Sequence, residues 1–358
     1  MKTRMTELFG IEHPIMLAGM NWLTQPKIVA AVCNAGGLGN LAISSHTPEE
    51  LRSDIRKIRE LTDKPFAVNQ ILLSPTASAN LAVVIEEKVP IVNYTLGRPP
   101  AIVPLVEAVH GYGGKVMATV ALARHAVRAE QLGVDAINVT GHEAAAHGGF
   151  ATTLVLIPLV ASSVKVPITA AGGFCDGRGL AAALVLGADG ITMGTRFAMT
   201  KESPLHEHWQ QVIIKATEQD TIYMDVGDPA VNARVLRTKK AEAEMRRRFP
   251  LFSDMAGVLE TRRLLKLSWW ELIRSGLSTR QGEGGMGMRE QLRYGASAAR
   301  AEKVLFGGDE KAGTLAIGQI IGGISDVPTC QELIERVAAE AEKVLEATTE
   351  KALDKIRT

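Results

Sequence analysis

Two glycine-containing loops have a composition typical of phosphate binding. One reads Ala171-Gly-Gly-Phe-Cys-Asp-Gly and the other Met193-Gly-Thr-Arg-Phe, and each follows a short apolar run. Glycine lets backbone N–H groups approach an anion closely, because it carries no side chain. One such loop could simply be a tight turn, but two of them after successive apolar runs favour a binding role. We therefore predict a phosphate cradle formed by Gly172, Gly173, Gly194 and Thr195.

The sequence lacks the fingerprints of two common nucleotide sites. No GxGxxG motif follows an expected strand, and no GxxxxGK motif followed by serine or threonine is present. The predicted phosphate therefore belongs neither to a dinucleotide in a Rossmann fold nor to a nucleotide on a P-loop.

A third loop carries groups suited to acid–base chemistry. Gly141-His-Glu-Ala-Ala-Ala-His-Gly-Gly holds two imidazoles and a carboxylate. Histidine titrates near neutral pH, so it can both accept and donate a proton. We interpret His147 as the candidate acid–base residue, with a structural role as the alternative, and we favour the structural role for His142. No metal site is predicted, because HExxH spacing is absent and the two glycines would end any helix that aligned the side chains.

Two further segments are expected to border the same site. Met16-Leu-Ala-Gly-Met-Asn-Trp contains Ala18, Gly19 and Met20, against which a flat ring could lie, and Asn69 closes Phe66-Ala-Val-Asn. Each could instead be an ordinary turn or capping residue. A phosphate cradle, a small-residue turn, an amide and a histidine around one cavity suit a phosphorylated planar cofactor.

Eight short apolar runs, each followed by a turn and a helical stretch, must position these loops. They recur roughly every 25 residues, as strand–loop–helix–loop units do, and their continuous apolar character fits parallel strands buried on both faces. We predict an α/β TIM (β/α)8 barrel, with the loops at the carboxyl ends of its strands. A doubly wound open sheet is the alternative, since periodicity does not distinguish the two. The expected strands are 14–18, 38–42, 66–69, 91–94, 116–119, 136–139, 168–171 and 190–193.

The pattern changes after residue 200. The segment 201–307 shows no strand period, contains three of the four tryptophans, and includes the glycine-rich Gln281-Gly-Glu-Gly-Gly-Met-Gly. We expect a helical insertion after the eighth strand that covers the barrel mouth as a lid or substrate subdomain. The barrel would then comprise 1–200 and 308–358, closed by a last helix over 327–355.

The insertion also carries a cluster of basic residues. A solvated helix face interleaved with Glu242 and Glu244 is one interpretation. The other is that part of the cluster faces the barrel mouth and binds the phosphates of a CoA-type substrate. The cluster consists of Arg234, Arg237, Lys239, Lys240, Arg246, Arg247 and Arg248.

The composition of the chain excludes several classes of binding partner. The 358 residues carry a net charge of +1 and only 4% aromatic residues, which argues against nucleic-acid binding. No apolar stretch reaches the roughly 18 residues of a membrane helix, and the N-terminus lacks an apolar signal core. Three cysteines without ligand spacing favour neither disulfides nor structural zinc. We therefore expect a cytoplasmic protein with a small-molecule substrate.

The combination of motifs resembles the FMN-dependent nitronate monooxygenases, formerly called 2-nitropropane dioxygenases, which share a fold with FMN-dependent enoyl-acyl-carrier-protein reductases. The resemblance includes His13-Pro-Ile-Met, Asn34-Ala-Gly-Gly-Leu-Gly, Pro65-Phe-Ala-Val-Asn and the three loops above. It implies FMN as the cofactor, with the four cradle residues at its phosphate and His147 as the catalytic histidine. It also implies flavin contacts from Ala18, Gly19, Met20, Asn69 and, at the cofactor side, Gln319.

The resemblance implies an FMN-dependent oxidoreductase in which His147 moves a proton at a substrate carbon while flavin N5 exchanges a hydride or an electron. The substrate could be an alkyl nitronate, or an acyl-CoA in a thioester dehydrogenase or enoyl reductase. Asn232-Ala-Arg-Val-Leu-Arg-Thr resembles a subgroup that acts on CoA thioesters of steroid-ring fragments. An NAD(P)H:quinone reductase and a non-catalytic flavin-binding module are further alternatives.

One departure from the family pattern lies in the histidine loop. The family usually has two glycines before the histidine, where this chain has Ala145 and Ala146. Alanine does not freely adopt the positive φ that glycine permits, so we expect the loop path or the space above the flavin to differ. The oligomeric state, the electron donor and the electron acceptor are left open.

Overall fold

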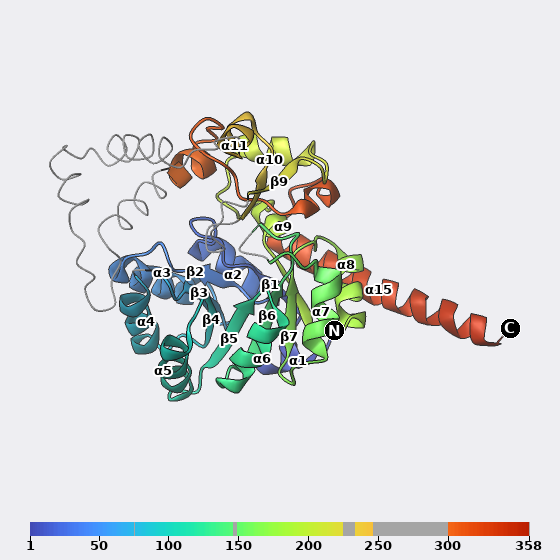
Figure 1. Cartoon of the computed structure of the whole chain (residues 1–358), viewed down its shortest axis with the longest axis horizontal. Coiled ribbons are helices and arrows are strands. Elements are labelled where there is room, and N and C mark those ends of the chain that lie inside the picture. The colour runs from blue at the N-terminus through green and yellow to red at the C-terminus, as the bar shows by residue number, and fades with distance from the viewer. Residues whose placement is uncertain (75, 146–148, 225–232, 246–299, 358) are drawn as a thin grey trace.

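Eight parallel strands form a closed sheet in the computed structural model, which describes residues 1–74, 76–145, 149–224, 233–245 and 300–357 (Figure 1). The hydrogen-bonded order is β1-β8-β7-β6-β5-β4-β3-β2. A parallel bridge between Met16 of β1 and Leu38, two residues before β2, closes the sheet between the two ends of this order. The predicted TIM barrel is confirmed, and the open-sheet alternative is wrong. The strands are β1 (Ile15–Leu17), β2 (Asn40–Ala42), β3 (Ala67–Ile71), β4 (Ile91–Thr95), β5 (Lys115–Val120), β6 (Ala136–Thr140), β7 (Ile168–Ala171) and β8 (Gly190–Met193).

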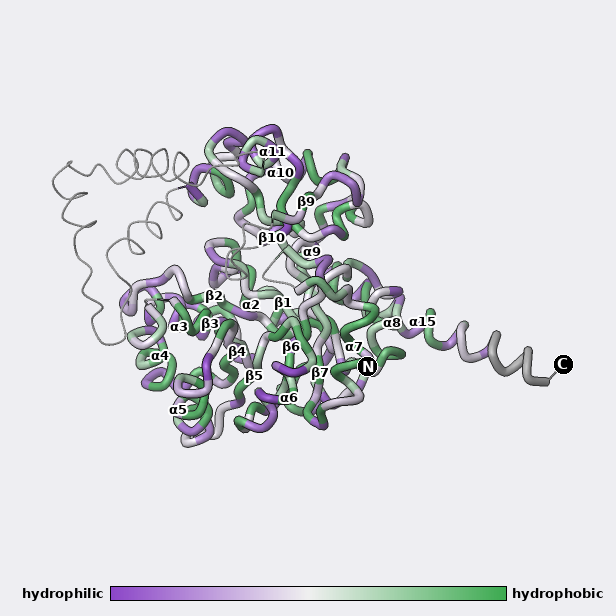
Figure 2. Tube along the Cα trace, in the orientation of Figure 1, coloured by the Kyte–Doolittle hydropathy of each residue, from purple (hydrophilic) through white to green (hydrophobic). Residues whose placement is uncertain are grey.

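The helices between the strands form the outer layer of the barrel. Several begin with recognisable signals: α3 has a capping box between Thr47 and Glu50, and α2, α3 and α5 carry proline in the first turn. In Figure 2 the strands are mostly hydrophobic, whereas the outer helices alternate hydrophobic and hydrophilic residues, as expected for helices with one buried face. These helices are α2 (Pro26–Asn34), α3 (Pro48–Leu61), α4 (Ala77–Glu86), α5 (Pro99–His110), α6 (Ala123–Gln131), α7 (Thr153–Ala161) and α8 (Gly177–Val185). A short helix α1 (Arg4–Phe9) precedes β1, and another, α9 (Thr195–Ala198), follows β8.

The C-terminal helix α15 (Cys330–Arg357) completes the outer layer by packing against α8 and α2. The contact with α8 is close, because a Cβ added at Gly177 would lie 2.4 Å from the backbone nitrogen of Ala341. Buried Leu333, Val337 and Ala341 form its inner stripe. The far end of the helix extends beyond the barrel in Figure 1.

The segment after β8 covers one end of the barrel and has its own apolar core. Its described elements are α10 (Glu207–Ile214), β9 (Thr221–Met224), β10 (Ala233–Leu236), α11 (Lys239–Met245), a π-helix (Glu302–Phe306) and a 3-10 helix (Gln319–Gly323). Trp209, fully buried, packs in this core, and its indole N–H donates to the Val304 carbonyl. The core therefore joins residues that come before and after the undescribed part of the insertion.

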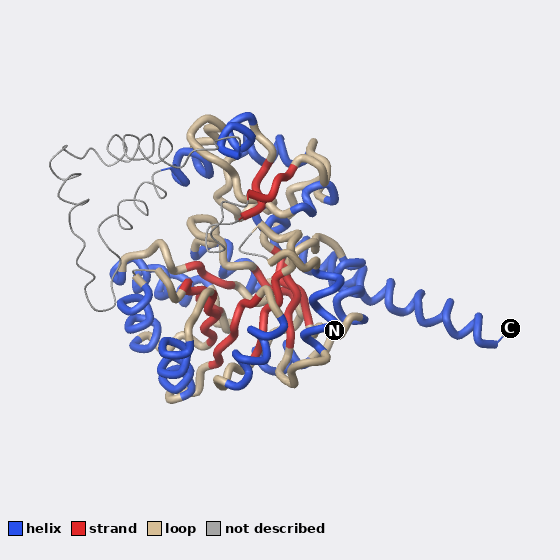
Figure 3. Tube along the Cα trace, in the orientation of Figure 1, coloured by secondary structure: helices blue, strands red, loops and turns tan. Residues whose placement is uncertain are grey.

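The insertion is not purely helical, as Figure 3 shows. Strands β9 and β10 pair antiparallel and are separate from the barrel sheet. A single pair of four-residue strands leaves no repeating period in the sequence, which is why a helical insertion was expected there. The domain boundaries at residues 200 and 308 stay a prediction. Among the described residues, no helix is both long and apolar enough to cross a membrane.

Candidate active site

A cavity of about 490 Å3 lies at the carboxyl ends of the barrel strands and continues beneath the insertion. Its volume is within the range of small-molecule sites. The barrel side is rich in amides and hydroxyls, with Asn40, Asn69, Asn93, Thr95, Thr119, Asn138, Thr140 and Thr192. The insertion side is mostly apolar, with Ala198, Leu205, Ala301, Val304, Leu305, Leu315, Ile317 and Ile320.

Most of the residues predicted from the sequence border this one cavity. Those that line it are Ala18, Gly19, Met20, Asn69, Gly172, Gly173, Gly194 and Thr195. Gln319 is not among the described lining residues, although its neighbours Gly318 and Ile320 are, and its backbone N–H donates to the Glu143 carbonyl at 2.8 Å. His147 lies outside the described residues, together with Ala146.

The cradle residues have a backbone suited to an anion. Gly172 and Gly173 have φ angles of +103° and +86°, a conformation that residues with a Cβ rarely adopt. Within the described part of the chain, the N–H groups of Gly172, Gly173, Gly194 and Thr195 donate to no other residue. The Thr195 hydroxyl accepts from the Gly318 N–H at 2.8 Å, which fixes the second loop against the segment after the insertion. Unpaired donors on two neighbouring loops fit a phosphate group.

The carboxylate of Glu143 anchors the histidine loop to the start of α7. Both of its oxygens accept from the Thr153 N–H, at 3.0 and 2.9 Å. The Thr153 hydroxyl lies 2.8 Å from Glu143 Oε2 and 2.8 Å from the Gly172 carbonyl, so it connects this loop to the cradle. The N-terminus of a helix stabilises a negative charge. Glu143 is therefore held by donors even though it borders the cavity.

His142 packs outside the cavity. Its ring centroid lies 4.5 Å from that of Tyr223 and 6.3 Å from that of Phe150, and its Nδ1 lies 3.0 Å from the Gly149 carbonyl oxygen. It is not one of the described residues that line the cavity. This geometry supports the structural role expected for His142.

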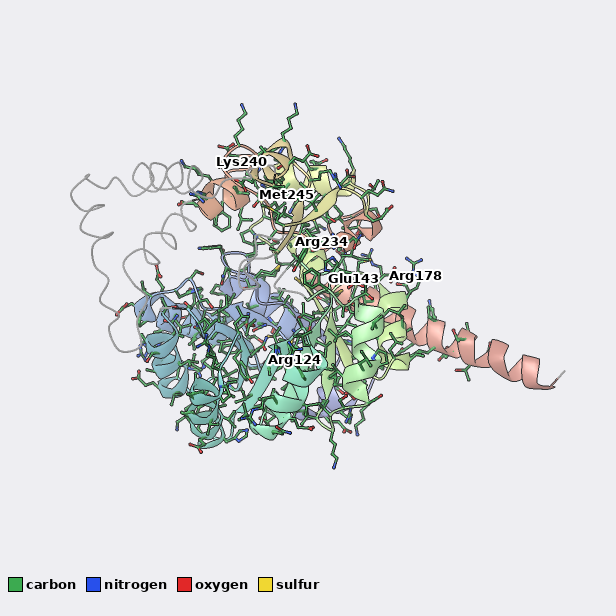
Figure 4. All side chains as sticks on the ribbon, viewed as in Figure 1. Arg124, Glu143, Arg178, Arg234, Lys240 and Met245 are labelled. Carbon is green, nitrogen blue, oxygen red and sulfur yellow. The ribbon has the colours of Figure 1, made fainter. Side chains whose placement is uncertain are left out.

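Arg234 departs from the other basic residues with which the sequence grouped it. It is only 6% exposed, and its Nε and Nη2 both donate to the His142 carbonyl at 3.3 Å. Its Nη1 donates to the Thr221 hydroxyl, and its backbone N–H donates to the Ala145 carbonyl. Burial lowers the pKa of this guanidinium below its ordinary value, because the charged form loses solvation. Figure 4 labels Arg234 and Glu143 at the junction of barrel and insertion.

Arg234 therefore connects the insertion to the histidine loop rather than facing a ligand's phosphates. Two other members of the cluster form ion pairs with acidic residues of the same segment. Arg237 Nη1 lies 3.9 Å from Glu242 Oε1, and Lys240 Nζ lies 3.4 Å from Glu244 Oε1. These pairs favour a solvated face for Arg237 and Lys240. Arg246, Arg247 and Arg248 lie outside the described residues.

We expect Arg234→Lys to reduce the free energy of unfolding by about 1–3 kcal/mol, because a lysine cannot reproduce the forked contact with the His142 carbonyl. Chemical denaturation measures this change. Arg237→Lys is the matched control, since Arg237 is exposed and its side-chain contacts, with the Gln219 carbonyl and the Glu242 carboxylate, lie at the surface. Its effect should stay within about 0.5 kcal/mol. Equal effects of the two substitutions would contradict the role given to Arg234.

Several polar residues of the cavity were not predicted from the sequence. Asn93 and Asn138 lie in the middle of Ile-Val-Asn-Tyr-Thr and Ala-Ile-Asn-Val-Thr, where a polar residue interrupts an otherwise buried strand. That interruption was the available signal. Asn40 is completely buried, and neither atom of its amide has a hydrogen-bond partner among the described residues. A buried amide without partners costs free energy that a ligand or a water could recover.

These features fit a flat, phosphorylated cofactor such as FMN. The glycine loops provide unpaired N–H donors, and a Cβ added at Gly172 would lie 3.1 Å from the Thr153 hydroxyl oxygen, so only glycine leaves that space open. Gly19 lies against Asn69, since its added Cβ would be 2.5 Å from the Asn69 amide nitrogen. The small-residue turn and the amide thus form one wall. No group of three or more possible metal ligands occurs in the described ranges.

Known proteins resemble the chain over most of its length. The family model described as "Nitronate monooxygenase" matches residues 2–81 and 76–340. A relative from Rhodococcus jostii (strain RHA1), named (3aS,4S,5R,7aS)-5-hydroxy-7a-methyl-1-oxo-octahydro-1H-indene-4-carboxyl-CoA dehydrogenase, is 34% identical over 97% of this chain and 98% of its own. A protein of the same name from Mycobacterium tuberculosis is 37% identical over 95% of this chain and 96% of its own.

Two further comparisons concern another named activity and a solved structure. A probable nitronate monooxygenase of Staphylococcus saprophyticus is 32% identical over 64% of this chain and 78% of its own. The structure of FabK from Thermotoga maritima has a TM-score of 0.81 and 34% sequence identity, covering 98% of this chain and 99% of its own.

Proposed function

Because the chain belongs to the nitronate monooxygenase family, we propose that it is an FMN-dependent dehydrogenase of an acyl-CoA thioester. The observation that carries the proposal is the apolar half of the cavity, which the segment after β8 builds. The relatives named as CoA dehydrogenases match this chain over nearly its whole length, that segment included. The probable nitronate monooxygenases match 62% to 64% of it.

We assign the cofactor to the polar, barrel side of the cavity and the acyl group to its apolar side. Bound FMN would supply an electron-pair acceptor at its N5 atom. Gly172, Gly173, Gly194 and Thr195 would hold its phosphate, while Asn69 and the turn of Ala18, Gly19 and Met20 would line its ring. Gln319 would support the site through its backbone bond to Glu143, which is a different role from a direct flavin contact.

His147 is proposed as the group that moves the proton. It follows Ala145 by two residues, and Ala145 lines the cavity. A carbon next to a thioester carbonyl is acidic enough for histidine to act as general base, because the carbonyl stabilises the resulting negative charge. The described start of the loop that carries His147 is anchored by Glu143 and by Arg234.

The apolar half of the cavity would bind the carbon skeleton of the acyl group. Leu205, Val304, Leu305 and Leu315 form a wall without charge, and burial of a hydrocarbon ring against it contributes about 25 cal/mol per Å2. A small alkyl nitronate would leave most of that wall uncovered. Glu244 and Arg300 are charged residues that also line the cavity from the insertion.

Nitronate oxidation is the second candidate, favoured by the family model and by the Staphylococcus relatives. The chain is an oxidoreductase in either case, so a flavin-binding module without turnover is not supported. Reduction by NADH or NADPH, as in a quinone reductase, would require no protein base.

The cofactor and the substrate class can be tested together. We expect the purified protein to be yellow and to release FMN on denaturation, since the sequence predicts one phosphate cradle and no adenylate site. Without oxygen, alicyclic acyl-CoA esters should bleach the flavin absorbance, whereas nitronates, NADH and NADPH should do so slowly or not at all. Bleaching by nitronates alone would favour the second candidate, and release of FAD would contradict the cofactor assignment.

A further inference from the structure

A directed chain of side-chain hydrogen bonds crosses the inside of the barrel and ends at the cavity. The hydroxyls of Thr169 and Thr192 donate to the Asn138 oxygen at 2.8 and 2.9 Å. The Asn138 amide nitrogen donates to the Thr119 hydroxyl at 3.2 Å, and that hydroxyl donates to the Asn93 oxygen at 2.9 Å. This series of hydrogen bonds therefore runs from β8 and β7 through β6 and β5 to β4.

The direction of these bonds fixes how the Asn93 amide lies. The Thr119 hydroxyl has one proton, and Asn138 donates to its oxygen, so the proton is available for Asn93. Asn93 must then present its oxygen to Thr119 and its NH2 group elsewhere. Asn93 lines the cavity, and its NH2 group has no hydrogen-bond partner in the ranges that the structure describes. A chain of aligned bonds strengthens each member, which holds the amide in this orientation.

Asn69 on the neighbouring strand is oriented in the same way. It is the register partner of Asn93 in the pairing of β3 with β4. Its oxygen accepts from the Thr95 hydroxyl at 3.3 Å, which again leaves the NH2 group without a partner among the described residues. Two adjacent NH2 donors, each oriented by a threonine, thus border the cavity on one wall.

We propose that Asn93, together with Asn69, donates hydrogen bonds to the ring carbonyl oxygens of the bound flavin, and that Thr119 and Asn138 are positioning residues for Asn93. The inference rests on the proposed FMN cofactor and concerns its ring rather than its phosphate. The wall suits carbonyl oxygens because it offers donors and no charge: within the described lining, the charged residues come from the histidine loop and the insertion, as Glu143, Glu244 and Arg300.

The test measures binding of FMN analogues to the full-length protein after its flavin has been removed, by quenching of flavin fluorescence. The probes are FMN, riboflavin, and the 2-thio and 4-thio forms of FMN, in which sulfur replaces one ring carbonyl oxygen. Sulfur is a weak hydrogen-bond acceptor, so wild type should bind at least one thio form about 5- to 10-fold more weakly than FMN. Asn93→Leu should weaken FMN binding by about 10-fold. It should also bring the ratio of the dissociation constants of the thio form and FMN closer to one. The ratio of riboflavin to FMN affinity should stay unchanged, because it reports the phosphate.

Thr119 provides a matched pair of variants. Thr119→Val removes the hydroxyl at nearly constant shape and should lose discrimination as Asn93→Leu does, whereas Thr119→Ser keeps the hydroxyl and should bind like wild type. Thr200→Val is the control for loss of a buried threonine hydroxyl, because Thr200 donates to the Phe197 carbonyl and is not among the described residues that line the cavity, so this variant should bind FMN and the thio forms like wild type. If Asn93→Leu does not fold, the comparison of Thr119→Val with Thr119→Ser still tests whether the oriented Asn93 amide binds the flavin ring.

The outcomes separate this inference from the proposed function. Wild-type protein that binds FMN without discriminating against either thio form would overturn the inference alone. Equal behaviour of Thr119→Val and Thr119→Ser would overturn the positioning role. Failure of the wild-type protein to bind FMN at all would overturn the proposed cofactor, and the inference with it.

Discussion

Replacing His147 with alanine is expected to leave the flavin bound and to slow flavin reduction by substrate about 10²- to 10⁴-fold, the range for loss of a general acid–base group. The flavin should stay bound because the predicted cradle lies on other loops, at Gly172, Gly173 and Gly194. The measurement is the rate of flavin bleaching after anaerobic mixing with an acyl-CoA, together with the flavin content of the purified variant.

His142→Ala is the matched control, because it removes an imidazole from the same loop. The His142 ring packs against Tyr223, outside the described lining of the cavity, so we expect at most a small loss of rate together with some loss of stability. A larger rate loss in His142→Ala than in His147→Ala would show that the wrong imidazole had been assigned. If neither substitution changed the rate, neither imidazole would be the base that acts on the acyl-CoA.

Gly173→Val is expected to weaken FMN binding by at least on the order of 100-fold, through two effects of the added side chain. At φ +86°, a residue with a Cβ is strained, so the loop should shift away from its present path. The side chain would also lie in the cradle beside Glu143, whose Cβ is 3.7 Å from the added Cβ. Loss of two hydrogen bonds to a charged phosphate is large enough for this effect. Titration of the deflavinated protein with FMN measures it.

Two other glycines separate these effects. Gly113 has a similar φ of +83°, and a Cβ added there would have nothing within 4 Å. Gly113→Val therefore introduces the same backbone strain away from the cavity, and the variant should still bind FMN. Gly194→Ala would place its Cβ 3.5 Å from the Ala18 Cβ, an ordinary contact, and should be tolerated, whereas a larger side chain there should not. Riboflavin binding should fall much less than FMN binding in Gly173→Val. Equal losses for the two ligands would argue against a phosphate at this loop.

Much of the barrel could be predicted from the sequence because its signals are local. Strands buried on both faces are continuous apolar runs, and β7 and β8 begin and end at the residues expected, 168–171 and 190–193. The turn chemistry is also local: Gly172 and Gly173 do adopt the positive φ that makes glycine necessary. Because loops after parallel strands all meet at one end of a barrel, the sequence also predicted that Ala18, Asn69 and Gly194 border one cavity.

The tertiary structure decided what no local pattern contains. Arg234 belongs to a basic cluster by sequence, yet strand β10 carries it to the carbonyl of His142, 92 residues earlier, and buries it there. The antiparallel pairing of β9 and β10, which places it, is too short to leave a period. Gln319 was expected beside the cofactor, but its described contact is made by its backbone.

The amides and hydroxyls that line the cavity show most clearly what the sequence predicts and what only the tertiary structure decides. A polar residue such as Asn93 within an apolar strand can be recognised in the sequence, but its partner cannot, because the partner depends on strand register and on how the sheet closes. Thr119 meets Asn93 and Asn138 only because β5 lies between β4 and β6 in a particular register. The sequence by itself determined which apolar runs form the buried strands and which turns need glycine, since both follow from side-chain size and polarity. The direction of each buried hydrogen bond follows from three strands at once, and so only the closed barrel decided it.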